Sequence, residues 1–283
     1  MELNKSMKQH SIEIERGERF HFGKNWSRFL TVLNDERIEE AKKSLQQMLD
    51  VDNTLEGKSF VDIGSGSGLF SLCARMLGAK VYSFDYDPQS VACTAELRRR
   101  YFPDDSNWVV KEGSVLDMNY LATLGQFDVV YSWGVLHHTG AMWQALENVS
   151  KMVRKGGHLF IALYNYQERK SDRWRKVKQL YCSGRIGRWA VVAVFIPYFF
   201  IGGLIIDLVR GKNPFLRYSE YKKQLRGMSR VYDWFDWLGG YPFEVAKPED
   251  IFNFFYNKGF QLTKLKTVAG RHGCNEFVFL KSN

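Results

Sequence analysis

The chain has 283 residues, of which 45% are hydrophobic and 25% charged, and its formal net charge is +9 at pH 7. This length can bury one large hydrophobic core or two modest ones, and the composition excludes a collagen-like, low-complexity or disordered chain. The first twenty residues are polar and lack the apolar core of a signal peptide, and the four cysteines form no C-x-x-C pair. Both features predict a cytoplasmic protein with reduced thiols.

Positive charge is concentrated in residues 165–230, which contain fifteen Lys or Arg against four Asp or Glu, a net +11. The rest of the chain therefore carries about −2. The same segment contains sixteen consecutive residues, 191–206, without a charged side chain. This difference in composition predicts that residues 165–230 form a structural unit distinct from the rest of the chain.

The N-terminal part is predicted to be helical. Residues 24–50 place apolar side chains near a 3.6-residue period, which predicts one helix. Asn25 and Trp26 stand at its start, where Asn25 also fits an N-cap.

Strands and helices alternate between residues 55 and 165. The predicted strands are 59–64, 80–87, 108–113, 127–133 and 158–165, and the predicted helices are 68–79, 88–102 and 141–155. Such alternation predicts a doubly wound α/β fold whose parallel sheet is covered by helices on both faces. A helix at 247–259 and strands at 260–270 and 275–281 follow.

We therefore divide the chain into four parts: an N-terminal helical extension (1–54), a core (55–164), an inserted helical lid (165–240) and a C-terminal helix and strands that complete the core (241–283).

The sequence VDIGSGSGLF places three glycines between the first strand and the next helix. Gly64, Gly66 and Gly68 allow the backbone to approach a ligand closely, and the helix N-terminus offers free N–H groups. The spacing differs from the G-x-G-x-x-G of dinucleotide-binding turns, and no phosphate-binding Lys follows. Asp62, just before the turn, suits a cationic ligand better than a pyrophosphate.

Two further segments follow the next strands. Asp85 lies seventeen residues after Gly68, close to the distance at which an acid meets a ribose diol, and Tyr86 is next to it. The alternative is a surface Asp at a strand end. The sequence EGSVLD follows the third strand and contains Ser114 and Val115.

These motifs and FDVVYSWGVLHH, in this order over about residues 55–165, resemble class I S-adenosylmethionine (SAM) dependent methyltransferases. Within that class, SWGVLHH and MVRKGGHLFIALYN are similar to the demethylubiquinol O-methyltransferase group. The resemblance implies a Rossmann-like, seven-stranded sheet with an antiparallel last strand, and SAM as cofactor.

The resemblance also implies roles for individual residues. Gly64, Ser65, Gly66 and Gly68 would face the methionine part of SAM, Asp85 its ribose, Ser114 and Val115 its adenine, and Ser132 and Trp133 its sulfonium. Tyr86 would lie against the adenine ring, and the N-terminal helix with Asn25 and Trp26 would close over the cofactor.

Some nucleic-acid methyltransferases are excluded. Amino-methylating enzymes of this fold have an N-P-P-Y/F motif after the fourth strand, where this chain has SWGV, and cytosine-C5 enzymes need a Pro-Cys nucleophile there.

Side chains that could bind or deprotonate the methyl acceptor follow the fourth and fifth strands. His137 and His138 stand where a neutral imidazole could take a proton from a phenol or thiol, and the alternative is that one is structural. Tyr164 and Tyr166 end the fifth strand and either orient the acceptor or pack under the lid.

Residues 226–246 are rich in aromatic and basic side chains, which predicts either an acceptor pocket wall or plain packing between domains. The candidate substrate-binding residues in this stretch are Arg226, Arg230, Tyr232, Trp234 and Tyr241.

These features favour methyl transfer to O or S of a small, largely apolar acceptor such as a phenol, quinol or thiol, without a metal. One alternative is an RNA or other macromolecule methyltransferase that uses the basic insertion, although there the basic residues interleave with an apolar run instead of forming a solvated stripe. Another is a lipid or quinone methyltransferase at the membrane surface.

The apolar run is predicted to be the inner surface of the lid. Pro197 is expected to break its helix, and Gly202-Gly203 offers a second hinge. The run is shorter than the roughly twenty residues of a membrane span. Residues 189–210, flanked by basic side chains, also fit contact with an anionic membrane surface or with a second copy of the chain.

Overall fold

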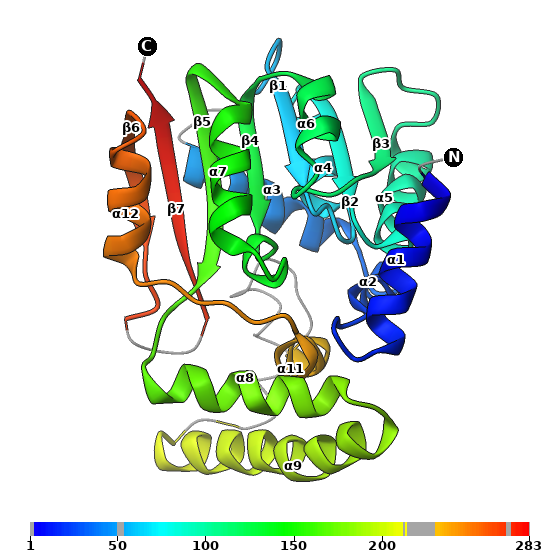
Figure 1. The fold of residues 1–283 in the computed structure, drawn as a ribbon, viewed down its shortest axis with the longest axis vertical. Helices are drawn as coiled ribbons and strands as arrows, with labels where there is room; N and C mark the ends of the chain where they lie inside the picture. Colours follow the sequence, from blue (N-terminus) through cyan, green and yellow to red (C-terminus); the bar gives the residue numbers. More distant parts are fainter. Residues whose placement is uncertain (1–2, 50–53, 212, 214–229, 270–272, 283) are drawn as a thin grey trace.

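The computed structural model describes residues 3–49, 54–211, 213, 230–269 and 273–282. Seven strands form one sheet in the order β3-β2-β1-β4-β5-β7-β6 (Figure 1). The strands are β1 (Ser59–Ile63), β2 (Lys80–Asp85), β3 (Trp108–Glu112), β4 (Phe127–Trp133), β5 (Val153–Tyr164), β6 (Phe260–Lys266) and β7 (Cys274–Lys281).

The sheet is mixed in direction. Strands β1 to β5 pair in parallel, whereas β7 runs antiparallel to both β5 and β6. The predicted Rossmann-like fold with an antiparallel last strand is confirmed. The chain order reverses at β1, which lies between β2 and β4, and such a switch point is where doubly wound folds bind ligands.

Helices cover both faces of the sheet (Figure 1). One face packs against α6 (Met118–Leu124), α7 (Met142–Met152) and α12 (Pro248–Tyr256). The other face packs against α2 (Phe22–Leu30), α3 (Asp35–Leu49), α4 (Leu69–Met76) and α5 (Pro88–Tyr101). Because both faces are covered, the central strands are apolar on both sides.

A third layer lies beyond the carboxyl ends of the strands. It contains α8 (Arg169–Cys182), α9 (Arg185–Val209) and α11 (Arg230–Gly239), with α9 on the far side of α8 from the sheet (Figure 1). Tyr181, Val191 and Leu238 form its small hydrophobic core together with Phe20, which follows α1 (Leu3–Glu15).

The N-terminal helix differs from the prediction. Residues 24–50 do not form one helix, because α2 ends at Leu30 and α3 begins at Asp35. The Asn34 side chain accepts a hydrogen bond from the backbone N–H of Arg37 at 3.1 Å and so starts a new helix. Asn25 lies inside α2 and is not its N-cap.

Other elements also differ from the prediction. Helix α1 lies inside the predicted N-terminal helical extension but had no predicted bounds, α6 lies where no helix was predicted, and α7 ends at Met152, three residues before the predicted end. Val153 pairs with Phe127 at the start of β5, and the register then shifts before Val129 pairs with His158.

The predicted break at Pro197 is wrong, since α9 is continuous over 25 residues with Pro197 inside it. Proline removes one backbone hydrogen bond. Phe195 and Phe199, on either side of Pro197, both pack on Trp174 of α8 and hold the two halves in line. The Gly202-Gly203 pair also stays helical.

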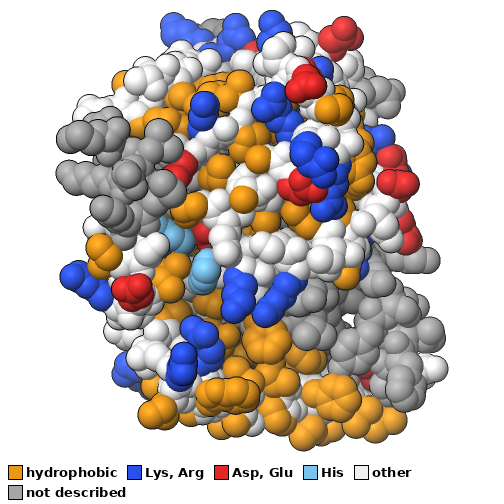
Figure 2. All heavy atoms as spheres, turned by 90° about the vertical axis from the view of Figure 1, so that its right-hand side faces the viewer, with side chains coloured by type: hydrophobic (Ala, Val, Ile, Leu, Met, Phe, Trp, Pro, Cys, Tyr) orange, Lys and Arg blue, Asp and Glu red, His pale blue; other side chains and the backbone are white. Residues whose placement is uncertain are grey.

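The apolar run is not an inner surface. Most of its large side chains are exposed on the side of α9 that faces away from α8, and they form the hydrophobic surface at the bottom of Figure 2. The helix is long and apolar enough to cross a membrane by length and composition, so the expectation that it is too short is also wrong.

We expect Phe255→Ala to lower the free energy of unfolding by about 3–5 kcal/mol. Phe255 is fully buried and its ring lies 4.7 Å from that of Phe279. Phe252→Ala, on the exposed side of the same helix, should cost below about 1 kcal/mol. Urea unfolding of both variants tests this, and equal losses would contradict the assigned core.

Candidate active site

A cavity of about 710 Å³ opens at the carboxyl ends of β1, β2, β4 and β5. This volume lies within the range of small-molecule sites. Its lining combines the glycine turn after β1, the ends of β2 and β4, the residues after α1, the hairpin end of β6 and β7, and Trp237 of α11. The cavity therefore has one side formed by the parallel strands and another formed by the N-terminal segment, α11 and the hairpin end of β6 and β7.

The glycine turn has a backbone that other residues cannot adopt without strain. Gly64 and Gly66 have φ values of 76° and 56°. A Cβ atom on Gly66 would stand 2.9 Å from Nε1 of Trp26, which lies against the turn from α2. A Cβ on Gly64 would overlap the Val135 side chain at 2.4 Å. The turn thus keeps the backbone open toward the cavity.

Asp85 ends β2 and ties the turn to that strand. Its carboxylate accepts hydrogen bonds from the backbone N–H groups of Gly66 and Asp87, both at 2.9 Å. Burial raises the pKa of Asp85 to about 7, although these hydrogen bonds oppose the shift.

Asp62 belongs to a buried polar chain beneath the turn. Its carboxylate accepts from the Ser71 hydroxyl at 2.5 Å, the Ser83 hydroxyl donates to Ser71, and Trp108 donates to Ser83. Burial raises the pKa of Asp62 to about 7, and the nearby Asp85 adds to this. Asp62 reaches the cavity wall, and the chain of hydroxyls fixes its position.

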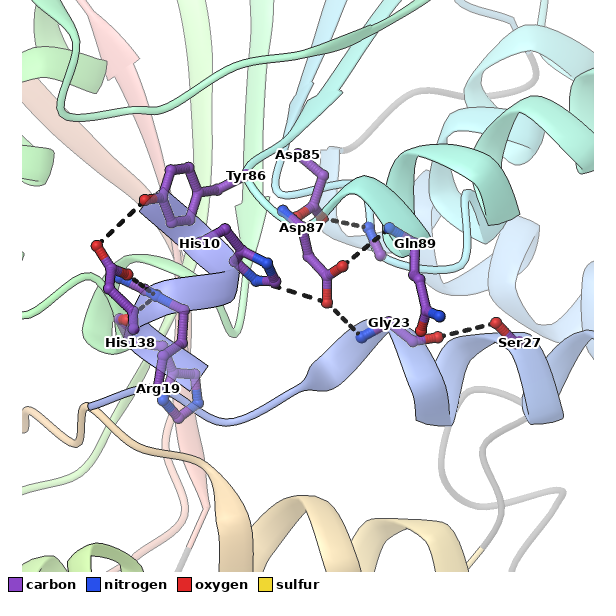
Figure 3. A network of polar contacts seen from close by, with 11 residues as sticks. His10, Arg19, Gly23, Ser27, Asp85, Tyr86, Asp87, Gln89 and His138 are labelled. Carbon is purple, nitrogen blue, oxygen red and sulfur yellow. Dashed lines mark hydrogen bonds and ion pairs between the residues drawn. The ribbon is translucent and has the colours of Figure 1, made fainter. Parts of the chain in front are cut away.

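The segment from α1 to α2 closes one side of the cavity (Figure 3). Glu13 accepts from the Tyr86 hydroxyl at 3.1 Å and from Arg19 at 2.7 Å. Arg19 also donates to the carbonyl of His138 at 3.0 Å and lies over the Tyr86 ring. These contacts connect the end of β2 with the histidine loop after β4.

A second link joins α2 to β2. Asp87 accepts from the backbone N–H of Gly23 at 2.7 Å and caps α5 by accepting from Gln89 (Figure 3). His10 lies 3.8 Å from the same carboxylate. The N-terminal segment is thus held by charged groups on the adjoining strand end.

His138 lies in the cavity wall with its protonation state fixed by its neighbours. Its Nδ1 is 2.7 Å from the carbonyl oxygen of Pro242, which only accepts hydrogen bonds. Nδ1 therefore carries the proton of the neutral ring and Nε2 has the free lone pair. Burial, reinforced by the Lys178 charge, lowers the pKa of His138 to about 3.

His137 has a different position. It is fully buried, its Nδ1 accepts from the backbone N–H of Tyr164 at 3.3 Å, and it is not part of the cavity lining. Burial, with the neighbouring His138, lowers its pKa well below the ordinary value. His137 therefore stabilises the loop after β4 from the side away from the cavity.

Lys178 is a buried cation beside these histidines. Its ammonium donates to the carbonyl of Trp237 and lies 4.3 Å from the centre of the Trp237 ring and 4.8 Å from that of Phe243. Cation–π contact and the hydrogen bond offset part of the cost of burying its charge.

Most of the predicted cofactor residues meet at the cavity. The predicted site residues that line it are Trp26, Asp62, Gly64, Ser65, Gly66, Asp85, Tyr86, Ser114, Val115, Trp133, His138 and Tyr164. Residues far apart in the sequence, from α2 to β5, are thus brought together as the motifs predict.

Other predicted site residues lie outside the lining. They are Asn25, Gly68, Ser132, His137, Tyr166, Trp234 and Tyr241. The Ser132 hydroxyl donates to the carbonyl of Ile63, between β4 and β1, and Tyr166 is exposed. Arg226 lies outside the described residues, as do the side chains of Arg230 and Tyr232.

Trp237, from the aromatic stretch 226–246 predicted as a pocket wall, lines the cavity. Several other lining residues were missed from the sequence. They are His10, Glu13, Arg19, Phe20, Phe22, Asp87, Lys266 and Glu276. The N-terminal ones stand in a polar segment without a motif, although the aromatic alternation in RFHFG was a signal. Lys266 and Glu276 pair across β6 and β7, with Nζ 3.4 Å from Oε1.

Comparison with known proteins gives a consistent result. Residues 61–159 match the model of a family described as a methyltransferase domain. A ubiquinone biosynthesis O-methyltransferase from Caulobacter vibrioides is 27% identical over 146 residues, 48% of this chain and 54% of that protein. A ribosomal protein L11 methyltransferase from Methylococcus capsulatus is 38% identical over 66 residues, 23% of this chain and 22% of that protein.

Among solved structures, magnesium protoporphyrin IX methyltransferase from Synechocystis PCC 6803 with bound S-adenosylhomocysteine has a similar fold. Its TM-score is 0.51 at 14% identity, covering 88% of this chain and 89% of that one. Residues 61–159 match a methyltransferase domain, and the fold of the chain is similar to that of this methyltransferase. The resemblance drawn from the motifs is confirmed.

The matched segments span about half, or less, of the curated relatives. Outside residues 61–159, which match the family model, lie α1, the lid and the last strands, and these supply one side of the cavity. Among the described residues, no group of three His, Cys, Asp or Glu is placed to hold a metal ion.

We expect SAM to bind this domain more tightly as the pH rises through about 7. The carboxylate of Asp85 accepts ribose hydroxyls best when ionised, and its pKa of about 7 without ligand means that it must lose a proton as the pH rises. Binding to the ionised form lowers that pKa, so affinity falls below about pH 7 and levels off above it. Calorimetry between about pH 6 and about pH 8 measures this.

Two asparagine variants separate the carboxyls. Asp85→Asn should remove the pH dependence and weaken binding by about 1.5–3 kcal/mol, about 10- to 100-fold. Asp62→Asn should retain the dependence, because the Asp62 carboxyl is held by Ser71. Affinity of the wild type that stays constant with pH would contradict the role of Asp85.

Proposed function

We propose that this protein transfers a methyl group from SAM to a hydroxyl oxygen of a small, largely apolar acceptor such as a phenol or quinol. The main observation is one cavity that combines the glycine turn and Asp85 with His138, Tyr164, Phe22 and Trp237. The O-methyltransferase relatives favour oxygen over sulfur as the acceptor atom.

The residues of the parallel-strand side fit SAM. The turn at Gly64–Gly66 would hold the methionine part, Asp85 the ribose and the region of Tyr86, Ser114 and Val115 the adenine. The carboxylates of Asp85 and Asp62 complement a ligand with net positive charge at its sulfonium. When bound, SAM supplies an electrophilic methyl group for in-line displacement.

His138 would handle the acceptor proton. A pKa of about 3 makes it too weak to deprotonate a free phenol, whose pKa is about 10, before reaction. The acidity of the hydroxyl rises steeply as its oxygen forms the new bond, so Nε2 can take the proton at that stage. The carbonyl of Pro242 holds the ring in the required tautomer.

The aromatic wall supports a small apolar acceptor over a macromolecule. The ring of Tyr164 lies 5.4 Å from that of Trp237, and Phe22 lies 4.9 Å from His138. Such rings displace water from the reacting atoms and bind flat, apolar molecules. The resemblance to a ribosomal protein methyltransferase covers only 23% of the chain.

Purified protein with SAM should release S-adenosylhomocysteine in the presence of hydrophobic phenols or quinols, and much less with thiols. Addition of EDTA should leave the rate unchanged, because the described residues contain no metal-ligand cluster. Turnover only with thiols, with amines or with a protein or RNA substrate would overturn the proposal, and a rate that EDTA abolishes and Mg²⁺ restores would overturn its metal-free chemistry.

His138→Asn should lower kcat by about 10²- to 10⁴-fold and leave SAM affinity unchanged. The Asn amide can still donate to Pro242 where Nδ1 does, but it lacks the basic Nε2. His137→Asn, behind the cavity wall, should affect thermal stability more than kcat in the folded fraction. If His138→Asn keeps full activity, the histidine holds the Pro242 loop and is not the base.

A further inference from the structure

Helix α9 presents an apolar face that nothing in the described structure covers. Eleven of its large hydrophobic side chains are at least 37% exposed. They are Ile186, Trp189, Val194, Tyr198, Phe200, Ile201, Leu204, Ile205, Ile206, Leu208 and Val209. A helix in contact with water on this side would be polar there.

The opposite face of α9 is fixed to the protein. Val192, Phe195, Ile196 and Phe199 of this face pack against the lid core, and Gly187, Val191, Gly203 and Asp207 are buried along the helix. The ring of Phe195 is 5.3 Å from that of Trp174 in α8. Helix α9 therefore lies lengthwise along the lid, over about 37 Å.

Positive charge surrounds the apolar face. Lys and Arg side chains lie directly above the hydrophobic surface in Figure 2. The exposed basic residues are Arg169, Lys170, Arg173, Arg175 and Lys176 of α8, Arg185 and Arg188 of α9, and Arg210, which follows α9. The exposed acidic side chains of the described lid helices are few, and Asp172 among them pairs with Arg175.

This charge distribution favours one of the two partners that could cover the apolar face, a second copy of the chain or a lipid bilayer. A second copy packed on it by two-fold symmetry would bring two basic rims together, which is repulsive. A bilayer with anionic headgroups complements both the apolar face and the rim. Trp189 and Tyr198 are exposed on α9, and such residues are enriched at membrane interfaces.

We propose that α9 lies in the plane of an anionic lipid bilayer, with its exposed face among the acyl chains and its basic rim on the headgroups. A spanning orientation would separate Val191, Phe195 and Phe199 from the lid core and move Asp207 into hydrocarbon. The docked helix stays attached to the lid.

The placement links the bilayer to the cavity. Aromatic rings run from Phe195 of α9 to Trp174, then to Trp237 at 5.2 Å and to Tyr164 at 5.4 Å in the cavity wall. This step rests on the proposed function: the acceptor is then a hydroxylated molecule that dissolves in lipid and reaches the cavity from the membrane side.

Flotation of the purified full-length protein tests the docking without requiring activity. The protein should float with vesicles of phosphatidylcholine and phosphatidylglycerol, and much less with phosphatidylcholine alone or at high salt. Tyr198→Glu/Ile205→Glu should lose most of the flotation. Tyr256→Glu/Met118→Glu is the matched control: Tyr198 and Tyr256 are both 65% exposed, and the control should float like the wild type.

Arg185→Gln/Arg210→Gln changes only exposed side chains and should remove the preference for phosphatidylglycerol, which tests the rim even if the glutamate variant does not fold. Wild type that ignores both vesicle types would overturn the proposal. So would a dimer in light scattering that the Tyr198→Glu/Ile205→Glu variant converts to monomer, or membrane-bound protein that resists alkaline extraction as a span does. Flotation with no methyl transfer to any phenol or quinol would instead count against the proposed function alone.

Discussion

The cavity depends on the carboxylate of Asp85 at the end of β2. It accepts from the N–H of Gly66 and from that of Asp87, and so joins the turn after β1 to the residue that caps α5. Asp87 in turn holds Gly23 and thereby α2, which places Trp26 against Gly66. The cofactor side is therefore one connected set of hydrogen bonds around a carboxylate whose pKa is raised by burial.

The other side of the cavity is built from segments that are remote in sequence. Arg19 reaches from the N-terminal segment to the histidine loop, Pro242 from the residues after α11 fixes His138, and Trp237 closes the wall. Each is held by the lid core, where Phe20, Tyr181 and Leu238 pack together. In the proposed function, cofactor affinity and acceptor chemistry would thus be determined by different parts of the chain.

The two sides of the cavity also differ in their titratable groups. Near the glycine turn, burial raises the pKa values of Asp62 and Asp85, and a ligand with positive charge would stabilise their ionised forms. Near the acceptor, burial and the Lys178 cation keep both histidines neutral. A neutral imidazole with a fixed tautomer suits proton acceptance from a hydroxyl in apolar surroundings, and the lid that encloses it is also the layer with the exposed apolar helix.

The sequence by itself determined the parallel strands, the glycine turn and the place of Asp85 at a strand end, because local patterns encode these: strand periodicity and a glycine turn that needs positive φ. The antiparallel last strand was expected only from the family resemblance. Nothing in the sequence indicated the roles of His10, Glu13 and Arg19, which have no local motif and acquire their contacts only when α1 folds against β2. The sequence also could not assign separate roles to His137 and His138, because they are adjacent in sequence and only the folded structure places one in the cavity wall and the other behind it. Pro197 predicted a break because proline costs a helix one hydrogen bond, yet α9 is continuous and Phe195 and Phe199 both contact Trp174. Whether an apolar run faces inward or outward depends on what packs beside it, and only the tertiary structure decides that.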